Sequence, residues 1–204
     1  MTAFTIHTID TAPEDSRETL RHVRKTLGMI PNLAAAMAES PTLLRSFFAV
    51  RDLYAQGSMR RIDIEVLSLT NAFENGCEWC MAFHSAGALK AGLSDEDLAR
   101  LRAGNAPTDP RLRALSDFSR SMVRNRGNVS AQDLEGFYAA GCTRAQTLEV
   151  VLGAGFSVMS NFSGHLADAP LGLAFEPHAW TKPDGGAGTR TLRTASAQTP
   201  SLSG

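Results

Sequence analysis

The sequence predicts an all-α fold, and three features of its pattern carry this prediction. Apolar residues recur at intervals of three and four along most of the chain, which is the period of one face of an α-helix. Residues that commonly begin or end helices bound these apolar segments. No stretch shows the sustained alternation of apolar and polar residues that is typical of a half-buried β-strand. We therefore expect a bundle of helices.

Helix start and stop residues place the helices in order along the chain. Gly28 ends the first predicted helix, because glycine adopts without strain the left-handed conformation that closes many helices. Pro31 and Pro41 stand where helices begin, since a proline in the first turn loses no helical hydrogen bond. Ser94 precedes three acidic residues and caps a short helix. The predicted helices span residues 13–28, 31–38, 40–57, 60–74, 77–92, 94–103, 110–125, 130–139 and 143–167.

Two of the predicted helices carry apolar stripes with the spacing i, i+4, i+7, i+11, which marks a face toward the core. The stripe of helix 40–57 consists of Leu43, Phe47, Val50 and Tyr54. The stripe of helix 60–74 consists of Ile62, Val66, Leu69 and Phe73. Glu65 borders this second stripe, so we expect its carboxyl group to be partly buried. Loss of hydration should then raise the pKa of Glu65.

Composition limits the class of protein. The chain has 204 residues, of which 43% are hydrophobic, and its formal net charge is −1. This predicts a single domain over residues 1–180, and the near-neutral charge argues against nucleic acid as a partner. No apolar run approaches the ~20 residues of a membrane span, so no membrane association is expected. Residues 181–204 are poor in large apolar side chains and predict a disordered tail.

Cysteine usage indicates the compartment. The chain contains three cysteines, an odd number that does not suit a disulfide framework. The N-terminus also lacks the basic and long apolar regions of a signal peptide. We therefore expect a cytoplasmic protein with one redox or catalytic pair and a third thiol, Cys142.

Two thiols and an imidazole are predicted to meet at the start of helix 77–92. The chain-reversing dipeptide Asn75-Gly76 precedes Cys77, so a new helix begins there. Cys77, Cys80 and His84 are spaced i, i+3, i+7 and therefore share one helix face. A helix N-terminus, a C-x-x-C pair and a nearby histidine each favour the thiolate, which attacks peroxides or disulfides. The spacing also allows the two cysteines to close a local disulfide.

These residues carry a family resemblance. Glu65, Cys77, Cys80 and His84 fit E-x11-C-x-x-C-x-x-x-H, and Lys90-Ala91-Gly92-Leu93-Ser94 follows. The pattern resembles the superfamily of AhpD-like alkylhydroperoxidases and carboxymuconolactone decarboxylases. The strong similarity covers residues 60–98, and a weaker one extends over about residues 14–175.

The resemblance implies an AhpD-like helical bundle and a peroxidase that uses no cofactor. By position, Cys80 would be the peroxidatic cysteine and Cys77 the resolving one, although helix position alone favours Cys77 as the more acidic thiol. Glu65 and His84 would relay protons. The implied partners are a hydroperoxide, a dithiol or thioredoxin-like reductant, and further copies of the chain in a trimer or a multiple of it. The best-studied branch has a histidine between the cysteines, where this chain has Trp79.

Alternative functions stay open at this point. One is a decarboxylase-like enzyme that acts on a small lactone or carboxylate. Another is a non-catalytic redox or metal-responsive module, since Cys77, Cys80 and His84, with Cys142 or another histidine as a fourth ligand, are of the types that bind zinc. His165 is either part of a pocket or a helix-terminal histidine near backbone carbonyls, and His178 has no assigned role.

A weak internal repeat is also present. Glu65 and Glu149 occupy the same place in two copies of the pattern G-x2-R-x4-E-V-aliphatic. In the second copy, Asn161 and Gly164 stand where the first has Cys77 and Cys80. Two interpretations are open: a duplicated helical unit of which one copy kept the chemistry, or chance similarity between amphipathic helices.

Overall fold

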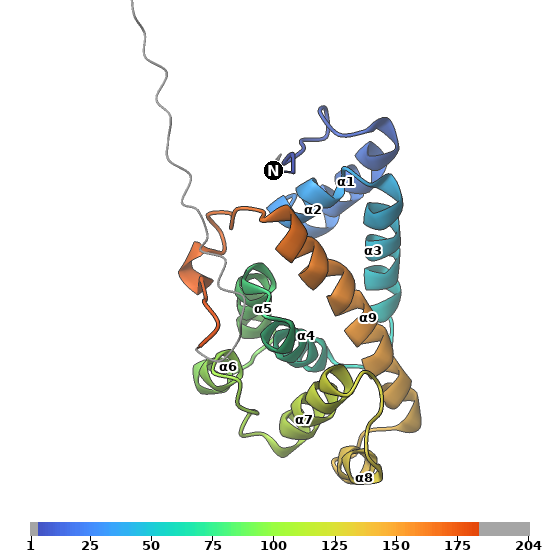
Figure 1. Cartoon of the computed structure of the whole chain (residues 1–204), viewed down its shortest axis with the longest axis vertical. Helices are drawn as coiled ribbons and strands as arrows, with labels where there is room; N and C mark the ends of the chain where they lie inside the picture. The colour runs from blue at the N-terminus through green and yellow to red at the C-terminus, as the bar shows by residue number, and fades with distance from the viewer. Residues whose placement is uncertain (1–3, 184–204) are drawn as a thin grey trace, which may run out of the picture.

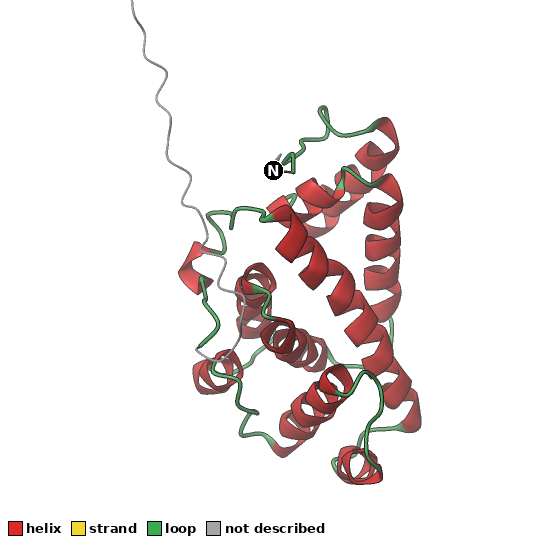
Figure 2. Ribbon diagram, viewed as in Figure 1, coloured by secondary structure: helices red, strands yellow, loops and turns green. Residues whose placement is uncertain are grey.

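All regular structure in the described part of the chain, residues 4–183 of the computed structural model, is helical, which confirms the predicted all-α class (Figure 1 and Figure 2). The elements are α1 (Glu14–Leu27), α2 (Asn32–Met37), α3 (Pro41–Tyr54), α4 (Arg61–Asn75), α5 (Glu78–Lys90), α6 (Asp95–Arg102), α7 (Pro110–Arg124), α8 (Ala131–Ala139), α9 (Arg144–Ala167) and the 3-10 helix η1 (Glu176–His178). Each α-helix matches its predicted range to within three residues at either end, whereas η1 was not predicted. The predicted tail lies, from residue 184 on, outside the described residues, and the domain limit near residue 180 stays a prediction.

The helix α4 lies at the centre of the bundle, where it packs against α5, α7 and α9 (Figure 1). Every residue of α4 from Glu65 to Ala72 is buried, so the helix is enclosed on all sides and not along one stripe only. The buried side chains of Asp63, Glu65, Thr70 and Asn71 are hydrogen-bonded, as burial requires. Asn71, for example, donates to Ser157 of α9 at 3.1 Å and accepts from Ser119 of α7 at 2.7 Å. These bonds fix the register of α4 against its neighbours.

The buried face of α3 differs from the predicted stripe. Leu44, Phe48 and Tyr54 are its buried side chains, whereas Leu43 and Val50 are only partly buried. The physical reason is that α3 packs against α1 and α2 as well as against α9, so its apolar face is wider than one stripe.

The longest helix, α9, has two contrasting faces. Its 24 residues run beside α2, α3 and α4 (Figure 1). The inner face carries small residues such as Gly153 and Ser157, which are buried and let the helices approach closely. The outer face exposes large apolar side chains: Leu148, Val151, Leu152, Val158, Phe162 and Leu166. None of the helices in residues 4–183 is both long and apolar enough to cross a membrane.

The chain after α9 returns across α5 and α6. Arg102 at the end of α6 donates to the backbone carbonyls of His178 and Ala179, each at 2.9 Å. The indole N–H of Trp180 donates to the Arg102 carbonyl at 2.9 Å. Through η1 the segment also packs against α5, the helix that begins at the predicted cysteine pair.

Candidate active site

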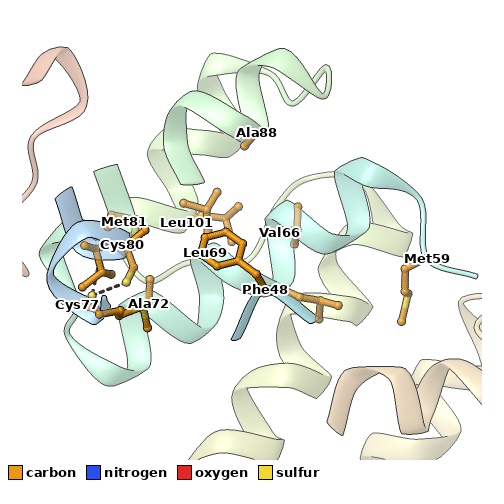
Figure 3. Close-up of a cluster of buried hydrophobic side chains, with 14 of the residues drawn as sticks. Phe48, Met59, Val66, Leu69, Ala72, Cys77, Cys80, Met81, Ala88 and Leu101 are labelled. Carbon is orange, nitrogen blue, oxygen red and sulfur yellow. Dashed lines mark hydrogen bonds between the residues drawn. The ribbon is translucent and has the colours of Figure 1, made fainter. Parts of the chain in front are cut away.

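The predicted cysteine pair lies at the N-terminus of α5. Gly76 has a φ of 69° and closes α4, so Cys77 becomes the N-cap residue of α5. The Cys77 sulfur accepts a hydrogen bond from the Cys80 backbone N–H at 3.3 Å. The Cys77 thiol donates to the Cys80 sulfur across 2.6 Å (Figure 3). Both residues are 1% exposed, and both cysteines are free, so the pair is in its reduced form.

The surroundings distinguish the two thiols. Burial raises the pKa of Cys80, but the hydrogen bond from Cys77, the charge of His84 and hydrogen bonds from Asn161 and Ser160 outweigh it. The pKa of Cys80 therefore lies below that of an ordinary thiol. The pKa of Cys77 is raised, first because its proton is held in the bond to Cys80 and second because it is buried. The geometry thus favours a thiolate on Cys80, although Cys77 lies nearer the helix N-terminus.

Glu65 of α4 lies between two hydrogen-bond partners, His84 and Arg61. Its side chain is 4% exposed, and it bonds Nδ1 of His84 through Oε2 at 2.8 Å and the Arg61 guanidinium through Oε1 at 2.8 Å. Burial raises the pKa of Glu65, but these two partners outweigh it and hold the pKa below its usual range. The predicted upward shift was therefore wrong, because it rested on burial alone and the two partners lower the pKa by more than burial raises it.

The ionised carboxylate determines how His84 is oriented. A carboxylate only accepts hydrogen bonds, so the hydrogen of a neutral His84 ring resides on Nδ1 and points at Glu65. The other ring nitrogen, Nε2, is then free to take or return a proton. His84 lies one helical turn beyond Cys80 on α5, and its charge favours the Cys80 thiolate. Glu65 therefore positions the imidazole.

Two helical glycines make room for this arrangement. A Cβ atom on residue 87 would lie 2.8 Å from both carboxylate oxygens of Glu65, which is shorter than a van der Waals contact allows. A Cβ atom on residue 164 would lie 3.1 Å from the sulfur of Cys77. Neither of these two contacts was predicted from the sequence, because a helical glycine indicates close packing but does not identify its partner.

A pocket of about 230 Å³ opens beside the pair. Three of the four predicted site residues line it, namely Glu65, Cys80 and His84, while Cys77 lies behind Cys80 and outside the lining. The remaining walls come mainly from α1, α2, α3, α4, α5 and α9 and are mostly apolar. The aromatic residues among them are Phe47, Phe48, Tyr54, Trp79, Phe83 and Phe156. The sequence pointed to α5 as the site but did not indicate which parts of α3 and α9 would face it.

Trp79 forms part of the pocket wall. Its ring stacks on Phe83 at 5.4 Å between centroids and contacts Phe175 at 6.0 Å. Its indole N–H donates to the Pro170 carbonyl at 3.4 Å. The position between the two cysteines is thus occupied by an aromatic surface, which leaves His84 as the one histidine that lines the pocket in the described part of the chain.

The remaining candidate residues lie elsewhere. His165 Nε2 is 2.9 Å from the backbone carbonyl oxygen of Asn75 and does not line the pocket. The His178 side chain does not line it either. Cys142 accepts from the Arg111 guanidinium at 3.4 Å. Within residues 4–183, no three His, Cys, Asp or Glu side chains are grouped so as to hold a metal ion.

The two copies of the internal repeat lie against each other. The helices α4 and α9 are in contact, and Asn75 of the first copy donates to Asn161 of the second at 2.8 Å. Asn161 also bonds Cys80, and Gly164 adjoins Cys77. The second-copy residues that stand in place of cysteines therefore support the cysteines of the first copy. Duplication and chance similarity both remain compatible with this packing.

Comparison with known proteins gives one family match, over part of the chain. The family model described as the carboxymuconolactone decarboxylase family matches residues 41–121, a range that contains Glu65, both cysteines of the pair and His84. No curated protein matches the chain in sequence.

Solved structures share the fold. A peroxidase-related protein from Ralstonia eutropha JMP134, described as an alkylhydroperoxidase AhpD core, superposes with a TM-score of 0.76 at 21% identity, covering 85% of this chain and 93% of that chain. A peroxidase-related protein from Silicibacter sp. TM1040 gives 0.70 at 20% identity, with the same coverage of 85% and 93%. A variant of the debrominase Bmp8 in complex with 2,3,4-tribromopyrrole gives 0.71 at 14% identity, covering 87% of this chain and 96% of that chain. The chain is thus similar in sequence to the carboxymuconolactone decarboxylase family over residues 41–121, and similar in fold to AhpD-core structures over most of its length.

Proposed function

We propose that the chain is a thiol-dependent peroxidase that reduces hydroperoxides through Cys80 and Cys77. One observation carries the proposal: Cys80 lines a pocket, its thiolate is stabilised by the Cys77 thiol, and the Glu65–His84 pair lines the same pocket. A thiolate in contact with a substrate cavity and a proton donor beside it is what peroxide reduction requires.

The chemistry proceeds in two steps. The Cys80 thiolate attacks the outer oxygen of the hydroperoxide, the O–O bond breaks, and the alkoxide leaves as an alcohol with a proton from His84. Cys80 is then a sulfenic acid. The Cys77 sulfur attacks the Cys80 sulfur, its proton and the hydroxyl leave as water, and a disulfide forms. Because the thiols are already in hydrogen-bond contact at 2.6 Å, this second step needs little movement.

A dithiol or a thioredoxin-like protein would restore the pair. It supplies two electrons and two protons and leaves as its own disulfide, which balances the reduction of one peroxide. The three free thiols suit the reducing cytoplasm expected from cysteine usage. The reductant must reach sulfurs that are both buried, and the pocket gives access to Cys80.

The proposal predicts how many thiols peroxide consumes. Reduced protein has three titratable thiols, and one equivalent of hydroperoxide should leave one, Cys142. With excess peroxide, consumption should continue when dithiothreitol, dihydrolipoamide or a thioredoxin system is present. We would measure free thiols and peroxide in parallel, and metal content in the same sample. Three thiols retained after peroxide, with no consumption for any reductant, would contradict the proposal.

Two other activities are tested by the same preparation. Decarboxylase-like chemistry is suggested by the family name, and it would persist in the Cys80→Ser variant because it needs no redox pair.

Debromination is suggested by the aromatic pocket beside Cys80 and by the fold shared with a debrominase. It would release one bromide and replace the C–Br bond by C–H as the dithiol becomes a disulfide. Bromide release from a bromopyrrole without peroxide consumption would favour this second candidate. A stoichiometric metal with neither activity would favour a metal-responsive module.

We also propose that the chain forms a homo-oligomer, a trimer or a multiple of it, through the outer face of α9. That face carries Phe162 at 53% and Leu166 at 70% exposure, in a row of apolar side chains along the helix. Contiguous exposed apolar surface of this kind commonly marks a protein interface. Light scattering at micromolar concentration should give a multiple of 21.9 kDa, and Phe162→Glu with Leu166→Glu should shift the mass to the monomer. Leu173→Glu, at an exposed site outside α9, is the matched control; a monomeric wild-type protein would contradict the proposal.

A further inference from the structure

The sulfur of Cys80 has polar neighbours on two helices, and the two sets differ in kind. On its own helix, α5, the Cys77 thiol donates to it across 2.6 Å, and the ionisable ring of His84 lies one turn beyond. The facing helix α9 presents two neutral side chains instead, Ser160 and Asn161. The relay described above uses α4 and α5, so the contribution of α9 is a separate question.

The helix α9 lies directly against the cysteine pair. A Cβ atom on residue 164 would lie 3.1 Å from the Cys77 sulfur, so the two helices are in close contact there. Asn161 lies three residues earlier, on the same face of α9, and is 1% exposed. Ser160 lines the pocket that Cys80 also lines. The Asn161 amide is therefore enclosed beside the pair, and burial requires that its N–H groups have acceptors.

The contact between Asn161 and Asn75, the last residue of α4, orients this amide. Asn75 Nδ2 donates to Asn161 Oδ1 at 2.8 Å. The backbone carbonyl oxygen of Asn75 also lies 2.9 Å from Nε2 of His165, which is a second contact of this residue with α9. Because Asn75 occupies the amide oxygen, the Nδ2 group of Asn161 is directed to the other side, where it bonds Cys80.

The number of donors decides which α9 residue can serve Cys80. A serine hydroxyl has one hydrogen to donate, whereas an asparagine amide has two. The Ser160 hydroxyl donates to the Ser157 carbonyl at 3.1 Å, so the same hydrogen cannot serve Cys80 at the same time. Asn161 Nδ2 lies 3.5 Å from the Ser160 hydroxyl oxygen, and its second hydrogen remains for the Cys80 sulfur. Asn161 is therefore the more constant of the two donors.

We propose that Asn161 is a catalytic residue that donates an Nδ2–H hydrogen bond to the Cys80 thiolate, and that Asn75 is a positioning residue that keeps this donor turned toward the sulfur. The inference rests on the proposed function, whose nucleophile is that thiolate. Hydrogen bonds to a charged acceptor are stronger than those to a neutral one, so the amide favours the thiolate over the thiol. The amide stays neutral at physiological pH, so its support does not depend on titration as that of His84 does.

The test measures ionisation of Cys80 without peroxide. Iodoacetamide alkylation of Cys80 would be followed by mass spectrometry across a range of pH in reduced protein. Asn161→Leu removes both N–H donors at similar side-chain size and leaves Glu65 and His84 in place. The midpoint of the alkylation profile should rise by about one pH unit, and alkylation below the midpoint should be about tenfold slower. Asn161→Ala, which only removes atoms, gives the same readout if circular dichroism shows that Asn161→Leu does not fold.

Asn71→Leu is the matched control for loss of a buried amide between α4 and α9. Asn71 is also 1% exposed, but its side chain bonds Ser157 and Ser119 instead of a cysteine. Both variants should lower the thermal midpoint, because each leaves former partners unpaired. Only Asn161→Leu should move the profile of Cys80. An unchanged profile in Asn161→Leu, or an equal shift in Asn71→Leu, would overturn the role of Asn161.

Asn75→Asp tests the orientation of the amide. A carboxylate only accepts hydrogen bonds, so Asn161 should turn its nitrogen toward position 75 and its oxygen toward Cys80. The midpoint should therefore rise in Asn75→Asp. It should rise less when Asn75→Asp is added to Asn161→Leu, because only the direct effect of the new charge then remains. Equal shifts in the two backgrounds would overturn the positioning role of Asn75.

The proposal and the peroxidase function fail separately. Alkylation involves no turnover, so a protein that consumes no peroxide but shows the predicted shifts would refute the function and keep the roles of Asn161 and Asn75. Peroxide turnover with a wild-type alkylation profile in Asn161→Leu would do the reverse.

Discussion

Cys80→Ser is expected to reduce peroxide turnover to the uncatalysed rate, whereas Cys77→Ser should leave a trappable sulfenate on Cys80 and stop recycling. The reason is the asymmetry of the pair. Cys80 lines the pocket and has the lowered pKa, while Cys77 lies behind it and donates its thiol proton. Serine at position 80 offers a hydroxyl with no comparable tendency to ionise. Serine at position 77 keeps a donor beside Cys80 but cannot form a disulfide.

Dimedone labelling with mass spectrometry measures both outcomes. After one equivalent of peroxide, Cys77→Ser should carry the label on Cys80, and wild type should carry little because the disulfide forms first. Cys142→Ser removes the third thiol, which lies outside the pocket beside Arg111, and serves as the control with wild-type turnover. A label on Cys77 in the Cys80→Ser variant, with turnover retained, would reverse the assignment of the two roles.

Helix positions were predictable from the sequence because local residues determine helix ends. Gly76 ends α4 in the left-handed conformation, and Thr143 caps α9 through the N–H of Gln146, as short-range rules expect. The buried face of α3 was predicted less well, because three neighbouring helices decide it together. The helix η1 was not predicted, because its three residues are too few to show a periodic apolar pattern.

In the candidate site, too, features set by one helix were predictable from the sequence, and features set by several helices were not. Cys77, Cys80 and His84 belong to one helix, so their spacing alone brings them together. The pocket also needs Tyr54 and Phe156, which come from helices far apart in sequence, and nothing in either helix indicates the other. The direction of the Glu65 pKa shift depends on which cations the fold brings to it. The burial of Glu65 was predictable from the sequence, but only the structure shows its hydrogen bond to His84.

Glu65→Gln and His84→Gln are each expected to slow thiolate formation on Cys80 while the helices persist. Glu65 holds His84 at 2.8 Å, and the charge of His84 favours ionised Cys80. General acid–base assistance of this kind is worth roughly 10²–10⁴ in rate. The double variant should lose less than the product of the two single losses, because residues that act as a unit are non-additive. Raising the pH should partly rescue each variant, since hydroxide then supplies the thiolate.

The pH dependence of stability provides a second measurement. The pKa of folded Glu65 lies below its unfolded value, so its ionised form stabilises the fold. That contribution is fully present above the unfolded pKa, about 4.3, and is lost as the pH falls through the folded value. Glu65→Gln removes this dependence, so its free energy of unfolding should decline less steeply in acid than that of wild type.

Gly87→Ala separates the geometry of the relay from its charges. The added methyl group would lie 2.8 Å from both oxygens of Glu65 and should displace the carboxylate from His84 without altering any titratable group. Gly155→Ala on α9 is the matched control, because a Cβ there meets nothing within 4 Å. We would follow iodoacetamide alkylation of Cys80 from about pH 6 to about pH 9, a range that brackets the ordinary thiol pKa, together with circular dichroism. Alkylation of Cys80 should be slower than in wild type in both Glu65→Gln and Gly87→Ala, and Gly155→Ala should react at the wild-type rate. Wild-type alkylation in Glu65→Gln, His84→Gln and Gly87→Ala across that range would contradict the relay, and Glu65 would then be a helix-packing carboxylate paired with Arg61 of the same helix.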